Sequence, residues 1–165
     1  MWIGTRLLAM ALLLWPLGTR ADESDPLQVP KGGARQQAVM AYNDGVKLMV
    51  DRQYAAAQRK FEEALGADEG LAEAHNNLAF SLRMQGALNR ERALRHYNRA
   101  LELKPDLARA YMYRGVLFTQ MGDLARARAD HARLLVLDPQ LAAKLERVMA
   151  GADRDDYDGL TPQYD

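Results

Sequence analysis

The 165-residue chain contains no cysteine and only three histidines. Without cysteine it can form neither disulfides nor thiolate metal sites, so a disulfide-held or zinc–cysteine scaffold is excluded. The histidines, His75, His96 and His131, form no His-Glu-x-x-His motif that would place two of them on one helix face. A glycine-rich phosphate loop is also missing. We therefore expect no catalytic residues, no metal site and no cofactor.

Long apolar runs are scarce, and the single clear one lies near the N-terminus. Residues 7–17 are almost wholly apolar, Arg6 precedes them, and small residues follow at Thr19 and Ala21. A basic start, a short apolar stretch and a small-residue cleavage site are typical of a secretory signal peptide. The run is too short for a membrane span, which needs about 20 apolar residues. We expect residues 1–21 to be removed and the chain to be exported, with a retained membrane anchor as the alternative.

The chain also has no excess of positive or negative charge. The chain has 22 basic and 22 acidic residues, and removal of residues 1–21 would leave 20 basic against 22 acidic, a balance of −2. Proteins that bind nucleic acid carry strongly basic domains. Nucleic acid is therefore not an expected partner.

The middle of the chain repeats itself with a period near 34 residues. Three copies, which open at Ala38, Ala72 and Ala108, align if two extra residues fall between 86 and 92. Two columns of the alignment hold small residues, namely Gly45, Ala79 and Gly115 in one and Ala57, Ala93 and Ala127 in the other. A repeat of this length that tolerates an insertion in a turn indicates stacked helical units.

Apolar residues within each copy are spaced by three and four, which predicts helices. Gly86 and Gly122 end two of these helices, and Pro105 and Pro139 mark boundaries between copies. The predicted helices cover residues 38–50, 54–65, 71–85, 91–103, 107–121 and 124–137. No stretch shows sustained strand alternation. The chain is therefore predicted to be all-α.

The two columns predict that the helices of each pair pack closely, with large residues such as Phe61 and Tyr97 filling the space beside the small ones. In this packing Gly45, Ala79 and Gly115 lie opposite Ala57, Ala93 and Ala127. A single helix pair cannot bury its apolar face, so the copies must stack. After Pro139, Leu141 and Leu145 continue the spacing and predict a capping helix that closes the stack. We expect a flexible leader at 22–35, a repeat domain at 36–150 with copies at 38–71, 72–107 and 108–141 and a cap at 141–150, and an acidic tail at 151–165.

Three segments resemble a known family. They are Ala-Glu-Ala-His-Asn-Asn-Leu-Ala at 72–79, Arg-Ala-Leu-Glu-Leu-Lys-Pro-Asp at 99–106 and Ala-Tyr-Met-Tyr-Arg-Gly at 110–115. The chain resembles tetratricopeptide repeat (TPR) proteins, of an exported bacterial type, over residues 38–140. It departs from the family pattern at Glu69, where Pro is usual, and at His131, where an aromatic is usual. The resemblance implies a right-handed α-solenoid of three TPR helix pairs plus a C-terminal capping helix.

The resemblance also implies a concave groove, lined by the first helix of each pair, that holds a peptide or a partner helix. In that groove Asn76 would pair with a bound backbone, and Arg83 and Arg109 would hold a carboxylate. The alternative is that the apolar positions simply pack against neighbouring helices. The positions carried over, called the groove residues below, are Tyr42, Val46, Met49, Asn76, Asn77, Phe80, Arg83, Arg109, Met112, Val116 and Thr119.

One known specificity within the family is not expected here. Chaperone adaptors of the family clamp a C-terminal carboxylate with five polar groups. Only Asn77 and Arg109 match that pattern, whereas Tyr42, Val46 and Tyr113 do not.

Charge is unevenly placed along the chain. Residues 83–133 hold 11 basic and 5 acidic residues, and the tail at 151–165 holds five Asp against Arg154. One interpretation is that both segments are simply solvated. The other is that the tail, or an acidic segment of a partner, docks on the second and third copies. The tail also weakly resembles a calcium loop, but the first and last ligands of such a loop are missing.

These observations favour a non-catalytic, exported adaptor that binds a protein segment, either acidic or of another character, and helps to assemble an envelope or secretion complex. The alternatives are a self-associating structural module and, less favoured, a calcium- or other metal-binding protein. The expected location is periplasmic or secreted, with no stable membrane span after signal cleavage.

Overall fold

The computed structural model describes residues 26–29 and 32–151. The expected signal peptide and the calcium-loop-like segment lie outside the described residues. Within them the chain is helical and has no strand, so the all-α prediction is confirmed. The helices are α1 (Gly33–Val50), α2 (Tyr54–Ala67), α3 (Ala72–Met84), α4 (Arg90–Leu103), α5 (Ala108–Gln120), α6 (Leu124–Leu137) and α7 (Pro139–Met149), with a 3₁₀ turn η1 (Ala87–Asn89) before α4.

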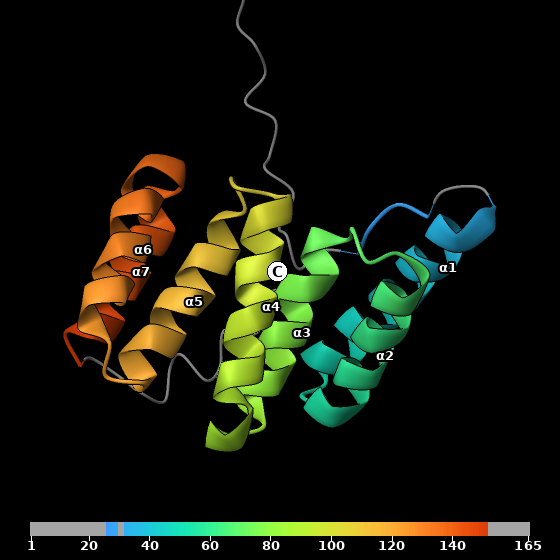
Figure 1. The fold of residues 1–165 in the computed structure, drawn as a ribbon, viewed down its shortest axis with the longest axis horizontal. Helices are drawn as coiled ribbons and strands as arrows, with labels where there is room; N and C mark the ends of the chain where they lie inside the picture. Colours follow the sequence, from blue (N-terminus) through green and yellow to red (C-terminus); the bar gives the residue numbers. More distant parts are fainter. Residues whose placement is uncertain (1–25, 30–31, 152–165) are drawn as a thin grey trace, which may run out of the picture.

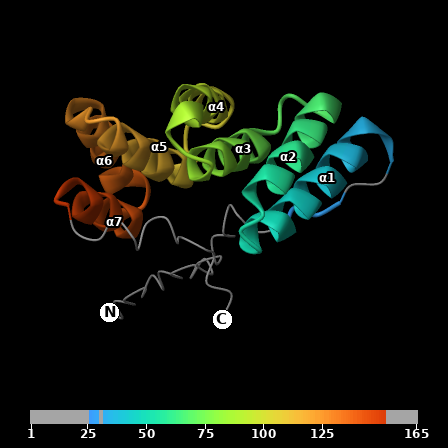
Figure 2. The ribbon, with the colours of Figure 1, turned by 90° about the horizontal axis from the view of Figure 1, so that it is seen from below.

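The helices follow one another as a row of antiparallel pairs, with α3 and α4 in the middle (Figure 1). Each pair packs on the next through α2 with α3 and through α4 with α5, and α7 closes the row against α5 and α6 (Figure 2). In addition, α1 contacts α3, α3 contacts α5 and α5 contacts α7. These four helices form the inner layer, and α2, α4 and α6 form the outer layer. The predicted stack of three helix pairs and a cap is confirmed.

None of the helices in residues 26–29 and 32–151 has both the length and the apolar character that a membrane crossing requires.

Small residues allow the close helix contacts, although not all in the way the alignment predicts. A Cβ added at Gly45 would lie 2.6 Å from the ring of Phe61, which is fully buried in α2. We expected Gly115 to serve the approach of Ala127 in α6. Instead, a Cβ at Gly115 would lie 2.4 Å from Cδ2 of Leu145. The side chain that fills this space therefore comes from the cap α7 and not from the outer helix.

The helix ends have identifiable causes. Gly86 and Gly122 have positive φ angles of 111° and 80°, a conformation that glycine adopts without strain. The cap begins at Pro139, two residues before the predicted Leu141, because a proline is well tolerated at the first helical position. The Asp138 side chain accepts hydrogen bonds from the backbone N–H groups of Gln140 (3.0 Å) and Leu141 (3.1 Å).

The N-terminal leader differs from the prediction. Helix α1 begins at Gly33 and not at Ala38, so residues 33–35 are helical. Before the helix, the N–H of Leu27 donates to Oδ1 of Asn43 (2.7 Å), and the carbonyl of Leu27 accepts from Nδ2 of Asn43 (2.9 Å). One amide side chain thus satisfies both backbone groups of Leu27 and attaches this segment to α1.

Candidate binding site on the inner helices

All eleven groove residues lie on the inner helices α1, α3 and α5. Nine of them are at most 6% exposed, and Arg109 and Thr119 are partly exposed. The six apolar members also belong to the continuous hydrophobic core: Tyr42, Val46, Met49, Phe80, Met112 and Val116. Packing against neighbouring helices, the alternative interpretation, therefore accounts for these six. A role for them in partner binding stays a prediction.

A chain of polar side chains crosses from α3 to α1. Nδ2 of Asn76 donates to Oδ1 of Asn77 (3.0 Å), and Nδ2 of Asn77 donates to the hydroxyl of Tyr42 (3.1 Å). Asn76 is fully buried, and its carbonyl oxygen Oδ1 has no hydrogen-bond partner in the described part of the chain. A buried amide oxygen without a donor is destabilising by about 1–3 kcal/mol. This oxygen therefore keeps an unused capacity to accept a hydrogen bond.

Arg83 lies two helical turns beyond Asn76, with Phe80 between them, so the three share one face of α3. The guanidinium carbon of Arg83 lies 5.3 Å from the ring centroid of Phe80. The Phe80 ring in turn lies 5.0 Å from that of Tyr113 in α5, and Tyr113 lies 6.5 Å from Tyr97 in α4. This set of rings, Phe80, Tyr97 and Tyr113, is called the aromatic cluster below.

The aromatic cluster supplies no negative charge. Burial raises the pKa of the Tyr97 phenol, so Tyr97 stays neutral at physiological pH. Arg83 is only 5% exposed and carries a guanidinium group. The site therefore combines a shielded cation, aromatic faces and an amide acceptor, which suits an acidic peptide segment chemically.

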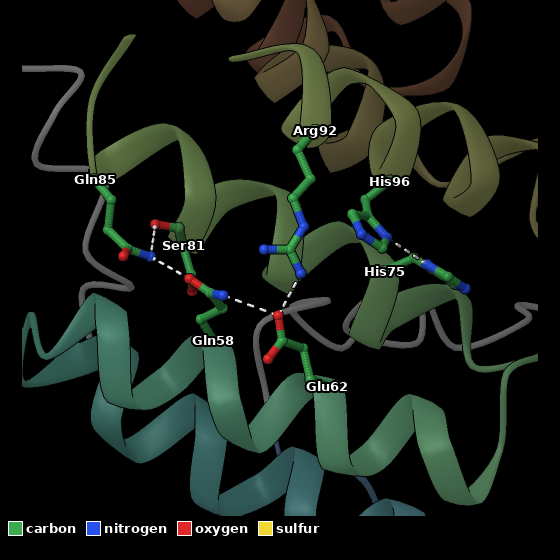
Figure 3. Close-up of polar contacts among 7 residues, drawn as sticks. All are labelled: Gln58, Glu62, His75, Ser81, Gln85, Arg92 and His96. Carbon is green, nitrogen blue, oxygen red and sulfur yellow. Dashed lines mark hydrogen bonds and ion pairs between the residues drawn. The ribbon is translucent and has the colours of Figure 1, made fainter. Parts of the chain in front are cut away.

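A second polar network, shown in Figure 3, joins the first helix pair to the second. Nε2 of Gln85 donates to Oε1 of Gln58 (2.8 Å) and to the backbone oxygen of Ser81 (3.1 Å). Nε2 of Gln58 donates to Oε1 of Glu62 (2.8 Å), which also forms an ion pair with Arg92. These bonds join α2, α3 and α4 and hold the two pairs in register. Nothing in the repeat pattern predicted them.

His75 and His96 form a pair that the sequence reasoning missed. Their Nδ1 atoms are 3.0 Å apart and their ring centroids 5.3 Å apart (Figure 3). Nε2 of His75 lies 3.1 Å from the carbonyl oxygen of Glu69 and must donate to it. In the neutral pair, Nδ1 of His75 therefore accepts the hydrogen bond and Nδ1 of His96 donates it.

The pair is neutral at physiological pH. Burial lowers the pKa of His75. Burial and the neighbouring His75 lower the pKa of His96 to about 4. In the part of the chain that the structure describes, no three or more His, Asp or Glu side chains gather where they could hold a metal ion.

The third helix pair is joined by a buried ion pair between Arg114 and Asp130. Nε and Nη2 of Arg114 lie 3.0 and 2.6 Å from the two carboxylate oxygens of Asp130, and Nη1 lies 2.8 Å from Oδ1 of Asn98. Burial raises the pKa of Asp130, and the hydrogen bonds from Arg114 act in the opposite direction. The alignment gave no sign of this pairing, because it placed Arg114 next to the small-residue column and assigned it no role.

Ion pairs also reduce the basic character that the sequence suggests for residues 83–133. Five of the eleven basic side chains in this segment pair with a carboxylate within the described residues: Arg92, Arg99, Lys104, Arg114 and Arg126. At least five of the eleven positive charges are therefore already neutralised by carboxylates of the described residues.

Comparisons with known proteins agree with this geometry. A family profile described as TPR repeat matches residues 89–122. The chain is 29% identical to the Photosystem I assembly protein Ycf3 of Acaryochloris marina over 104 residues. The aligned region covers 62% of this chain and 62% of the relative. It is 34% identical to Tetratricopeptide repeat protein 36 of Xenopus tropicalis over 111 residues. That aligned region covers 65% of this chain and 54% of the relative. The chain thus spans only about half to two thirds of the length of these relatives.

Among solved structures, the chain resembles the first TPR of Spaghetti (RPAP3) bound to the HSP90 peptide SRMEEVD. The TM-score is 0.63 at 22% identity, over 70% of this chain and 93% of that one. At this identity the likeness establishes the fold. The chain therefore contains a TPR repeat and has the all-α solenoid fold of TPR proteins, with three helix pairs and a capping helix.

Proposed function

We propose that this chain is a non-catalytic adaptor that binds an extended protein segment along its inner layer. The observation that supports this most directly is the buried oxygen Oδ1 of Asn76, which has no hydrogen-bond partner in residues 26–29 and 32–151. A backbone N–H of a bound peptide would satisfy it. Phe80 and Arg83 continue the same helix face and would take an apolar and an acidic side chain of that peptide.

The expected partner segment is acidic. Arg83 and Arg109 both lie on inner helices, and a carboxylate binds a guanidinium through two parallel hydrogen bonds. The relatives support a protein ligand, because one of them is named as an assembly protein and one similar structure holds a peptide. Recognition of the HSP90 type is not proposed, because Asn77, one of the two residues that match the chaperone-adaptor pattern, already donates its amide to Tyr42.

Peptide binding tests this proposal. Fluorescent 12-residue peptides rich in Asp and Glu would be titrated against the full-length chain, with versions carrying Asn and Gln as neutral controls. We expect Arg109→Gln to weaken binding of the acidic peptides about tenfold or more, the effect of losing one charge-assisted hydrogen bond. Arg128→Gln on the outer helix α6 is the matched control, because Arg128 is exposed. Equal affinities for the two variants would refute the site.

We further propose that the adaptor is exported and acts in the periplasm or outside the cell, where it helps to assemble an envelope or secretion complex. The support is the signal-like pattern of residues 1–21. N-terminal sequencing of the protein recovered from a bacterial envelope fraction tests this, with a mature chain expected to begin near Asp22. Recovery of the intact chain from the cytoplasm alone would contradict export.

Self-association is a second candidate, favoured by an apolar patch on α6. Leu135 and Val136 are 56% and 76% exposed near the C-terminal end of the row. Exposed apolar side chains that lie together commonly mark an interaction surface. Sedimentation velocity over a range of concentrations would show growth in mass if copies stack here, and Val136→Glu would abolish that growth. A constant monomer mass would remove this candidate.

A further inference from the structure

His75 on α3 and His96 on α4 point ring nitrogens at each other, and the proposed function uses neither side chain. Their Nδ1 atoms are 3.0 Å apart, whereas their ring centroids are 5.3 Å apart. The difference is about one ring diameter, so the two nitrogens lie close to the line that joins the ring centres (Figure 3). In the neutral pair, a single proton therefore lies between two nitrogens that face each other.

We propose that this histidine pair is a two-coordinate site for a monovalent copper ion, Cu(I), which takes the place of the shared proton. Imidazole nitrogen is a common ligand of copper. Cu(I) has a filled d shell, which imposes no preferred bond angle. With two ligands, their mutual repulsion favours opposite sides of the ion. The collinear arrangement of the His75 and His96 nitrogens matches this geometry.

The hydrogen bond on the far side of the His75 ring supports a ligand role. Nε2 of His75 lies 3.1 Å from the carbonyl oxygen of Glu69 and donates to it. Histidines that bind metals almost always donate their other ring N–H to a carbonyl, a carboxylate or water, which fixes the ring and its tautomer. The bond to Glu69 therefore leaves Nδ1 of His75 without a proton and directed at His96, as a metal ligand must be.

The protonation state of the pair also suits metal binding. Burial lowers the pKa of His75, and burial together with the neighbouring His75 lowers the pKa of His96 to about 4. Metal ligands must be deprotonated, so both imidazoles are competent at neutral pH. When Cu(I) binds, the proton on Nδ1 of His96 leaves, and Nε2 of the same ring, which carries no proton in the neutral pair, takes one up. Both ligands stay neutral, and no electron is transferred.

The surroundings favour a monovalent ion over a divalent one. No third His, Asp or Glu of the described residues joins the pair in a metal cluster, whereas Zn(II) usually takes three or four protein ligands. Three acidic and three basic side chains of the described residues act electrostatically on the two rings: Glu62, Glu69, Glu102, Arg92, Arg95 and Arg99. Their charges cancel, so a divalent ion would gain no net attraction to offset its larger desolvation cost.

The site must open slightly to admit the ion. A metal–nitrogen bond is about 2 Å long, so two collinear bonds need the nitrogens about 4 Å apart, which is about 1 Å more than in the pair. His75 is held by Glu69 and is 9% exposed, whereas His96 is partly exposed. Movement of the His96 ring towards solvent provides the space and gives the ion a path into the site. A bound ion would then join α3 to α4 and stabilise the second helix pair.

The first test needs no substitution and uses Ag(I), which has the charge and the filled d shell of Cu(I) and is stable in air. The full-length chain, labelled with ¹⁵N in its histidines, is titrated with silver nitrate at pH 7 without chloride. We expect the Nδ1 resonances of His75 and His96 to shift together and to saturate, while those of His131 stay in place. Methionine thioethers also bind such ions, but they do not shift these resonances. If the His75 and His96 resonances do not move, or if His131 moves equally, the proposal is overturned.

The second test measures the affinity for Cu(I), without oxygen, by competition with the chelator bicinchoninate. We expect His75→Gln and His96→Gln each to weaken binding at least about 100-fold, because even the loss of an outer hydrogen-bond partner costs about 10–100-fold. His131→Gln is the matched control, since His131 lies on α6, and it should bind as the wild type does. Circular dichroism shows whether each variant is folded. Equal affinity of the wild type and a folded His96→Gln variant would contradict the site.

Stability and zinc binding complete the test. A saturating excess of Cu(I) should raise the Tm of the wild type by about 5 °C or more, and that of His96→Gln by much less. Equal shifts in the two proteins would show that the ion binds elsewhere. If Zn(II) binds more tightly than Cu(I) and depends on the same two histidines, the assignment to a monovalent ion is wrong. Peptide affinity enters none of these measurements, so their failure would leave the adaptor function standing.

Discussion

The inner helix α3 and the outer helix α6 show opposite relations between polarity and burial. Helix α3 buries eleven of 13 residues, including Asn76, Ser81 and Arg83, whereas α6 buries three of 14 and exposes Leu135 and Val136. The reason is position, because α3 packs against α1, α2, α4 and α5, while α6 packs against α5 and α7. In this solenoid, the position of a helix in the stack determines how many of its side chains are buried, and the polarity of those side chains matters less. Buried polar groups on α3 are therefore the informative ones for function.

The same substitution in the two helices gives the largest expected contrast. Leu78→Ala in α3 removes a side chain that is 1% exposed and should cost about 2–5 kcal/mol in the free energy of unfolding. Leu135→Ala in α6 removes an exposed side chain and should change it by no more than about 0.5 kcal/mol. Urea unfolding followed by circular dichroism measures both values. Similar values for the two variants would mean that the stack does not bury α3 as described.

The next contrast is between two acids of the third helix pair, namely Asp130, which is buried in α6, and Asp123, which is partly exposed and caps that helix. Asp130 is 3% exposed and forms the ion pair with Arg114. We expect Asp130→Asn to cost about 1–3 kcal/mol in urea unfolding, because Arg114 then loses its charged partner. Asp123→Asn at the start of α6 is the control, since Asn caps a helix about as well as Asp. If the control costs as much as Asp130→Asn, the buried pair has no special role.

The smallest expected effect concerns pH and the pair of His75 on α3 with His96 on α4. The pKa of His96 is about 4 in the fold, below the ordinary value of 6.5. Between these two pH values the unfolded chain binds a proton that the folded chain does not. Stability is therefore complete above pH 6.5 and falls as the pH decreases towards 4.

Because His96 is partly exposed, we expect a loss of only about 1 kcal/mol over that window, or a few degrees in Tm. Thermal unfolding at pH 7 and at pH 4.5 measures it. Carboxylates also titrate in this range, so the informative quantity is the difference between wild type and His96→Gln. The variant should lose less stability than the wild type on acidification. Parallel curves for the two proteins would show that the pair does not contribute.

Most of the fold could be predicted from the sequence, because its causes are local. Apolar spacing, Gly86, Gly122 and Pro139 placed most helix ends within a few residues. The start of α1 was missed, because the pair Gly32-Gly33 was interpreted as part of a flexible leader. The neighbour of Gly115 was also missed. It is Leu145, and contact with a later helix cannot be read from a repeat column.

The candidate site was predictable only in part. Its positions on the inner helices follow from repeat register, but the burial of Asn76 and Arg83 depends on what packs over them. His75 and His96 are 21 residues apart, and Arg114 and Asp130 are 16 apart. No spacing rule for a single helix joins such residues. Only the stacking of neighbouring helices brings them together.

Site-specific photo-crosslinking tests most directly whether partners bind the inner layer. A benzophenone amino acid would replace Thr119 on inner helix α5 or Val136 on outer helix α6, and each full-length variant would be irradiated with the acidic peptides described above. Thr119 is partly exposed and Val136 is 76% exposed, so both positions should accept the substitution. We predict crosslinks from position 119 that are lost with Arg109→Gln, and none from position 136. Crosslinks from position 136 alone, or equally from both, would contradict the assignment of the inner layer as the binding surface.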